Sequence, residues 1–215
     1  MMARRSVLGL LAGVALSSLA GCGGRGTALR YRLTVEVETP SGLKTGSSVL
    51  EYVYPSRTGL VFGQAPIVDL GDGRYVFSLI NKGAGPSTII RYKDLQPPMP
   101  PIDDIPWSEF EYANEIKPFG VIKRDDYPML VTFGDINDPK TVHEFDPGTV
   151  RRITFQVVDE DEPLTEGIEE RLPWLGKYPE TPLEIRPPAS PPMNVGEAPL
   201  AQRLLKMNFS FRGSK

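Results

Sequence analysis

The chain has 215 residues, with 24 lysines and arginines against 27 aspartates and glutamates, and a formal net charge of −3. This length suits one domain that buries roughly 70% of its unfolded surface and needs no disulfides. The mild acidity argues against a protein whose main task is nucleic-acid binding, because that task requires a basic patch. A single cysteine and a single histidine exclude a zinc site built from several such ligands.

The N-terminus has the three parts of a bacterial export signal in their usual order. A basic pair, Arg4-Arg5, precedes an uncharged region at residues 7–19 that is rich in Leu, Ala, Gly and Val, and Leu19-Ala20-Gly21-Cys22 follows. The last four residues resemble the bacterial lipobox. This resemblance implies that diacylglycerol is attached to Cys22, that residues 1–21 are removed, and that the new N-terminus is acylated.

Acylation of Cys22 predicts an anchored protein, because each buried methylene contributes ~0.8 kcal/mol and two or more acyl chains bind a membrane stably. We expect residues 1–21 to be a signal peptide and residues 22–28 to be a lipidated tether. The expected location is the cell envelope, facing the periplasm. Gly23, rather than Asp, after the cysteine favours the outer membrane over the inner one.

Other interpretations of the N-terminus stay open. Residues 6–24 carry no charge, so they are long enough for an uncleaved transmembrane helix of ~20 residues. The cysteine can also fall by chance in a signal peptide that is cleaved without lipidation. Arg4-Arg5-Ser6-Val7-Leu8 resembles a twin-arginine motif, which leaves the export route open as well.

Alternating residues predict strands behind the tether. Apolar and polar side chains alternate over residues 31–38, which is typical of a strand with one buried face. Residues 39–42 have the proline and glycine of a turn, and residues 47–54 are expected to return as an antiparallel partner. Residues 65–70 and 74–80 flank a Gly-Asp-Gly connection, which predicts a second hairpin.

The rest of the chain contains shorter elements. Residues 82–87 are expected to form a loop, and residues 96–106 are too rich in proline for a helix or a central strand. Thr165 is a plausible N-cap for a helix that ends at Leu172. Further strands are predicted at residues 89–92, 130–133, 152–157 and 206–212, and other short helices at residues 107–116 and 138–142.

This pattern predicts a mainly β fold, because hairpins dominate and no strand–helix–strand rhythm occurs. We expect an antiparallel sandwich-like domain with a few short helices over residues 29–175. Residues 176–199 are expected to form a Pro-rich arm on the surface, and residues 200–215 a C-terminal strand.

Several segments resemble a family of uncharacterised bacterial exported proteins. They cover about half of the mature chain, and the motifs of the second half, such as Leu172-Pro173-Trp174-Leu175, are the more specific. Similar chains end near this motif, so the tail from Gly176 onward is an addition here. The resemblance implies one folded unit and brings no activity. The resembling segments are residues 31–40, 46–49, 68–74, 130–133, 135–139, 152–154 and 167–175.

Candidate binding residues are few. Asp135, Asn137 and Asp138 can offer oxygen ligands to calcium, but their spacing lacks the glycine and the terminal glutamate of an EF-hand loop, and Asx turns or a helix cap explain the same residues. Trp107 and Trp174 follow prolines, which is typical of contact surfaces, although core packing is the more common role of such residues. Together these five residues form the candidate interaction surface.

Catalytic patterns are weaker still. The acidic pairs Asp103-Asp104 and Asp125-Asp126 are adjacent in sequence, and such pairs on loops are usually solvated. We therefore expect a lipid-anchored, non-enzymatic module that binds or scaffolds, with the membrane and another envelope protein as partners and no cofactor. An envelope hydrolase with a carboxylate site is the alternative, and a ligand-carrying β domain would need a closed apolar cavity.

Overall fold

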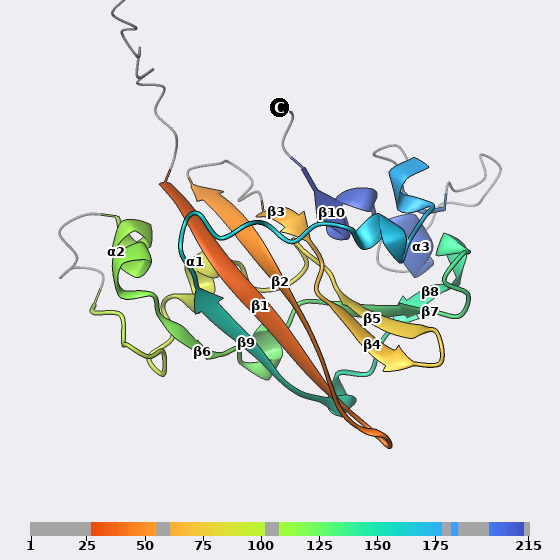
Figure 1. Ribbon diagram of the computed structural model, residues 1–215, viewed down its shortest axis with the longest axis horizontal. Coiled ribbons are helices and arrows are strands. Elements are labelled where there is room, and N and C mark those ends of the chain that lie inside the picture. Colours follow the sequence, from red (N-terminus) through yellow and green to blue (C-terminus); the bar gives the residue numbers. More distant parts are fainter. Residues whose placement is uncertain (1–26, 55–60, 102–107, 178–181, 185–197, 213–215) are drawn as a thin grey trace, which may run out of the picture.

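A computed structural model of the chain describes residues 27–54, 61–101, 108–177, 182–184 and 198–212 (Figure 1). The signal peptide, Cys22 and Trp107 lie outside these ranges, as do most of the Pro-rich residues 176–199. Within the described ranges, no helix combines the length and the apolar character needed to cross a membrane.

The described chain is mainly β, as predicted, and contains two antiparallel sheets. The larger sheet has, from edge to edge, β10 (Ser210–Phe211), β3 (Val61–Gln64), β2 (Gly42–Tyr54), β1 (Thr27–Thr39), β9 (Val150–Val157) and β6 (Phe119–Val121). The smaller sheet has β4 (Ile67–Gly71), β5 (Arg74–Ser78), β7 (Leu130–Phe133) and β8 (Val142–Glu144).

Helices in the described residues are short. The α-helices are α1 (Pro86–Ile89), α2 (Glu109–Ile116) and α3 (Leu200–Arg203). Turns of 3-10 helix lie at Arg124–Asp126, Pro139–Thr141, Pro147–Thr149, Ile168–Glu170, Leu175–Lys177 and Lys206–Asn208.

The predicted first hairpin is confirmed. β1 and β2 pair without interruption from Thr27 opposite Tyr54 to Thr39 opposite Gly42, and they form the long diagonal pair in Figure 1. Because side chains alternate along a strand, every second residue of β1 from Leu29 to Val37 points to the same face and is buried. This inner face of the larger sheet is where the core and the cavity described below are built.

The two sheets meet most closely where β2 passes β4. A Cβ atom added at Gly46 would lie 1.9 Å from the carbonyl oxygen of Ile67, which no side chain tolerates. Glycine at this point of β2 therefore allows the smaller sheet to pack against the larger one.

The smaller sheet is covered on both faces, so the core has two parts. Val76 of β5 joins the apolar cluster against the inner face of β1 and β9, while the next residue, Phe77, joins a second cluster. In that second cluster Phe133 and Phe209 pack edge-on against Phe77, and Trp174 packs against both of them. The chain beyond residue 167 thus provides the outer cover of the smaller sheet.

Two predicted elements are wrong. Residues 89–92 are not a strand, because α1 begins at Pro86, where proline presets the helical φ and needs no N–H partner, and Ile90 N donates to Pro86 O. Thr165 caps no helix. Its hydroxyl instead accepts a hydrogen bond from Val49 N of β2, at 2.8 Å, and the 3-10 turn begins after Gly167.

The C-terminal segment also differs from its prediction. Residues 206–208 form a 3-10 turn, in which the Asn208 side chain accepts a hydrogen bond from Leu205 N at 2.8 Å, and only Ser210 and Phe211 pair with β3. Within residues 176–199, Leu183 is buried and hydrogen-bonded to Leu204 O, so the chain is part of the core at this point and not a surface arm.

Candidate ligand-binding site

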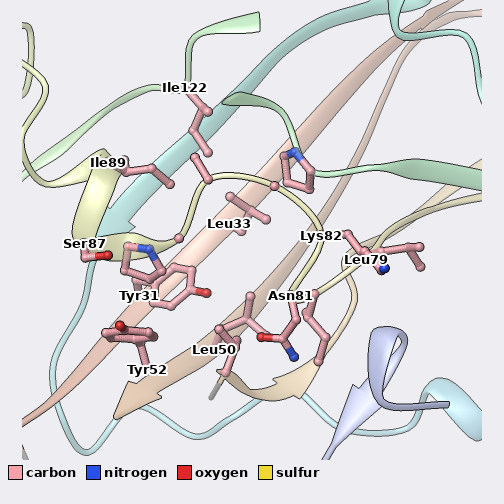
Figure 2. A pocket seen from close by; sticks show the side chains of 17 residues that line it. Tyr31, Leu33, Leu50, Tyr52, Leu79, Asn81, Lys82, Ser87, Ile89 and Ile122 are labelled. Carbon is pink, nitrogen blue, oxygen red and sulfur yellow. The ribbon is translucent and has the colours of Figure 1, made fainter. Parts of the chain in front are cut away.

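A cavity of about 270 Å³ lies between the inner face of the larger sheet and the segment that follows β5 (Figure 2). Strands β1, β2 and β3 form one wall, and residues 79–89 form the other. The lining residues are Tyr31, Leu33, Leu50, Tyr52, Val61, Leu79, Ile80, Asn81, Lys82, Gly83, Ala84, Gly85, Pro86, Ser87, Ile89, Ile122 and Pro128.

Residues 81–84 form the lip of this cavity and are fixed to the chain at residues 126–129. Asn81 has a φ of 60°, a left-handed conformation that asparagine adopts more readily than most residues. Met129 N donates to Lys82 O at 2.6 Å, and Ala84 N donates to Asp126 O at 3.3 Å. The lip is therefore held by backbone hydrogen bonds on both sides of Gly83.

Gly83 is required at this lip for two reasons. Its φ is 153°, which L side chains rarely adopt, and an added Cβ would lie 2.7 Å from Pro128 Cα. The close approach of these two residues separates the cavity from a second hollow of about 570 Å³. The two hollows share Asn81, Lys82, Gly83 and Pro128 in their linings.

Two tyrosines supply polar groups on the wall formed by the larger sheet. The Tyr31 ring stacks on Phe155 with centroids 5.0 Å apart, and the Tyr52 ring packs on Phe110 at 5.5 Å. Tyr31 is 5% exposed and Tyr52 7% exposed. No hydrogen bond from either hydroxyl is found among the described residues, and neither oxygen is among the fully buried polar atoms that lack a partner, so both hydroxyls remain accessible.

The Tyr31 hydroxyl is protonated at neutral pH and can donate a hydrogen bond. Burial raises the pKa of Tyr31 well above its ordinary value, and the neighbouring Tyr52 raises it further. Figure 2 shows this hydroxyl directed into the space enclosed by the lining residues, and the Asn81 amide directed into it from the lip. A phenol and an amide therefore face one space from opposite walls.

The remaining lining is apolar or basic. Leu33, Leu50 and Ile122 contribute hydrocarbon, while Lys82 is the charged residue of the lining and Ser87 adds a hydroxyl. No aspartate or glutamate is among the described residues that line this cavity. The described side chains of its walls therefore offer hydrogen-bond donors and neutral acceptors, one cation and no anionic group.

The sequence-predicted interaction residues lie elsewhere. Trp174 is 8% exposed, packs edge-on against Phe133 and donates from Nε1 to Ile136 O at 2.9 Å, so its ring is core. Trp107 lies outside the described residues. Among the described residues, the exposed large apolar side chains are Leu43, Phe119 and Val121, none of which belongs to the cluster around Trp174.

The acidic residues considered for calcium form turns. Asp135 Oδ1 accepts from Asn137 N at 2.9 Å, and Asp138 Oδ1 accepts from Lys140 N at 3.0 Å, which caps the 3-10 helix at Pro139–Thr141. The described residues contain no group of three or more His, Cys, Asp or Glu arranged to hold a metal ion.

The acidic pairs do not form a catalytic dyad in the described chain. The Asp126 carboxylate accepts a hydrogen bond from the Tyr92 hydroxyl, whose ring also lies under Lys123 Nζ at 4.6 Å. Its neighbour Asp125 belongs to the same 3-10 turn and lines none of the hollows described above. Asp103 and Asp104 lie outside the described residues.

Comparisons with known proteins give no match: no family model fits the sequence, and neither the curated proteins nor the solved structures contain a match to the chain. The resemblance of the segments to a family of exported proteins therefore stays a hypothesis.

Sequence reasoning placed Tyr31 on the buried face of a strand but did not identify it as a binding residue. The available signal is the residue type, because a tyrosine on a fully buried strand face brings a hydroxyl that needs a partner. The opposite wall was unpredictable, since residues 82–87 were expected to be only a loop.

Proposed function

We propose that this protein is a ligand-binding domain held at the bacterial cell envelope by acylated Cys22. The observation that carries the proposal is the cavity between the larger sheet and residues 79–89, into which the hydroxyl of the largely buried Tyr31 side chain points. A mostly apolar pocket with a few convergent polar groups is the usual form of a small-molecule site.

The cavity volume limits the ligand. A cavity of 150 Å³ in an engineered protein binds benzene, so a cavity of about 270 Å³ suits an apolar body larger than one aromatic ring. On the same scale this is on the order of ten carbon atoms. The adjoining hollow beyond Gly83 gives room for groups that extend out of the cavity.

Binding is favoured over hydrolysis by the chemistry of the walls. A carboxylate-based hydrolase needs two acidic groups that converge on one bond. The cavity wall offers tyrosine, serine, asparagine and lysine side chains and no carboxylate among its described residues. The envelope hydrolase considered from the sequence is therefore the weaker candidate.

The lipobox supports the membrane attachment. Thr27, where β1 begins, lies five residues after Cys22 in the sequence, and at ~3.5 Å per residue these five steps span at most about 18 Å. Tyr31 lies only four residues into β1. The anchor would thus keep the cavity end of β1 close to the membrane surface, with the outer membrane as the favoured site.

Intact mass and membrane fractionation test the anchor. The native protein should lose residues 1–21, gain acyl mass and remain with membranes, and Cys22→Ala should abolish both the added mass and the retention. If the variant keeps the same membrane retention, or if the native protein retains residues 1–21, acylation of Cys22 is not the anchor.

Fluorescence titration with 2-naphthol, a small neutral arene, tests the cavity. We expect saturable binding to the protein carrying Cys22→Ala, and loss of that binding after Leu33→Phe, because the larger ring occupies the space (Figure 2). Leu164→Phe is the matched control, since Leu164 lines a separate hollow beside Phe62 and Phe211. Binding that Leu33→Phe leaves unchanged would place the site elsewhere and reject this function.

A further inference from the structure

We propose that the cavity selects an amphiphilic monoanion, a carboxylate on an apolar body of on the order of ten carbon atoms. In this proposal Tyr31 and Asn81 donate to the carboxylate, and Leu33, Leu50 and Ile122 contact the apolar body. The inference rests on the proposed ligand-binding function and deepens it by naming the class of ligand.

The first argument is the unpartnered hydroxyl of Tyr31. This side chain is 5% exposed, and no hydrogen bond from its hydroxyl to another described residue is found. The hydroxyl oxygen is not among the fully buried polar atoms without a partner, so it is accessible from the cavity and can donate to an acceptor bound there. Burial raises the pKa of Tyr31, so the phenol keeps its proton at neutral pH and can donate a hydrogen bond to an anionic acceptor.

The second argument is the sign of the charges. Lys82 belongs to the lining of both hollows, and Arg124 belongs to that of the second hollow only. In the second hollow Glu144 is the acidic residue among the described lining, and the cavity itself has none. Donors and a net positive lining favour an anion over a cation of the same shape.

The third argument is the arrangement of polar and apolar groups. Asn81 is exposed at the lip, whereas Leu33, Leu50 and Ile122 are buried behind it. A carboxylate at the lip keeps partial contact with water, which avoids the large cost of burying a charge completely. A volume of about 270 Å³ admits one short chain or ring system and is far too small for a two-chain phospholipid.

Three probes of matched chain length test the head group: decanoate, decanol and decyltrimethylammonium. Each displaces 2-naphthol from the protein carrying Cys22→Ala, below the concentration at which the probe aggregates. We expect decanoate to bind at least tenfold more tightly than the ammonium, with decanol between them. Equal affinity for all three, with displacement still lost after Leu33→Phe, would overturn the anion preference and leave the ligand-binding function standing.

One variant and a matched control test whether the Tyr31 hydroxyl donates to the carboxylate. Tyr31→Phe removes only the hydroxyl and should weaken decanoate binding about tenfold or more, because a hydrogen bond to a charged group is stronger than one between neutral groups. Tyr75→Phe is the matched control, since Tyr75 of β5 packs against the other core cluster. If both variants bind decanoate like the parent protein, Tyr31 does not hold the head group.

Asn81→Asp supplies the sharper test. Aspartate is nearly isosteric and is also enriched in the left-handed conformation found at this position, so the lip should keep its shape. The new negative charge should lower decanoate affinity by tenfold or more and raise affinity for decyltrimethylammonium. Circular dichroism of every variant shows whether the fold is kept, and an unchanged order of affinities in folded Asn81→Asp contradicts the proposal.

Discussion

Tyr31 of β1 stacks on Phe155 of β9 with ring centroids 5.0 Å apart and an angle of 29° between the ring planes. The two strands are adjacent in the larger sheet, and Leu33 lies directly opposite Phe155 in the register. The ring of Tyr31 is thus a structural element of the sheet, while its hydroxyl faces the cavity. The two parts of this side chain have separable roles, and the predictions below use that separation.

We expect loss of the Tyr31 ring to reduce stability much more than loss of its hydroxyl alone. Tyr31→Ala removes a buried ring and should lower the free energy of unfolding by about 3–5 kcal/mol. Tyr31→Phe keeps the stacking on Phe155 and should change it by less than about 1 kcal/mol, because the hydroxyl makes no hydrogen bond within the described chain. Urea unfolding measures both values. A large loss in Tyr31→Phe would show that the hydroxyl has a protein partner.

The same residue predicts a dependence on alkaline pH. The pKa of Tyr31 is raised in the folded state by burial and by Tyr52, from an ordinary value of 10.0. Its contribution to stability is therefore complete below pH 10 and is lost as pH rises above it, because the unfolded chain ionises first. The slope for one proton is about 1.4 kcal/mol per pH unit. The free energy of unfolding of Tyr31→Phe should fall less steeply between pH 10 and 11 than that of the parent protein, and equal slopes would count against the raised pKa.

Filling the cavity should be tolerated where filling the core is not. Leu33→Phe adds its ring toward free space, so the free energy of unfolding should stay within about 1 kcal/mol of the parent value or increase. Leu172→Phe makes the same change at a fully buried position of the second core cluster and should cost about 1–3 kcal/mol through overpacking. Thermal unfolding of the two variants compares them directly, and equal losses would mean that the space beside Leu33 is too small to accept a ring.

We expect any side chain at Gly46 to destabilise the fold. Gly46→Ala places a methyl group 1.9 Å from Ile67 O, so either β2 or β4 must shift, and we expect a loss of about 3 kcal/mol or more in the free energy of unfolding. Gly134→Ala is the control, because the nearest atom there is 3.6 Å away, in ordinary contact. Similar denaturation midpoints for the two variants would contradict the close packing of the sheets.

Local sequence patterns were sufficient for most of the strands. Alternation over residues 31–38 predicted β1, and the turn at residues 39–42 predicted its pairing with β2, because period and turn chemistry are properties of neighbouring residues. The same patterns misassigned α1, where Ile89 and Ile90 suggested a strand although Pro86 starts a helix. Short apolar runs are ambiguous between helix and strand, and only their packing decides.

For the candidate interaction residues, the sequence was a poor guide. Trp174 and the acidic turn at Asp135 were noticed because of their residue types, but the tertiary structure uses the first in the core and the second in hydrogen bonds of a turn. Tyr31 and Asn81 were not selected as site residues, because they are 50 residues apart and neither belongs to a recognisable sequence motif. They form a candidate site because the fold brings both residues to the lining of one cavity.

The sequence by itself determined the mainly β class, the positions of most strands and the expectation of a lipidated Cys22, since each depends on residues close together in the chain. Only the tertiary structure decided that β2 and β4 are in contact at Gly46 and that a cavity separates residues 79–89 from part of the larger sheet. Those features arise when distant segments pack around Gly83 and Pro128, and a cavity is the space that such packing leaves unfilled.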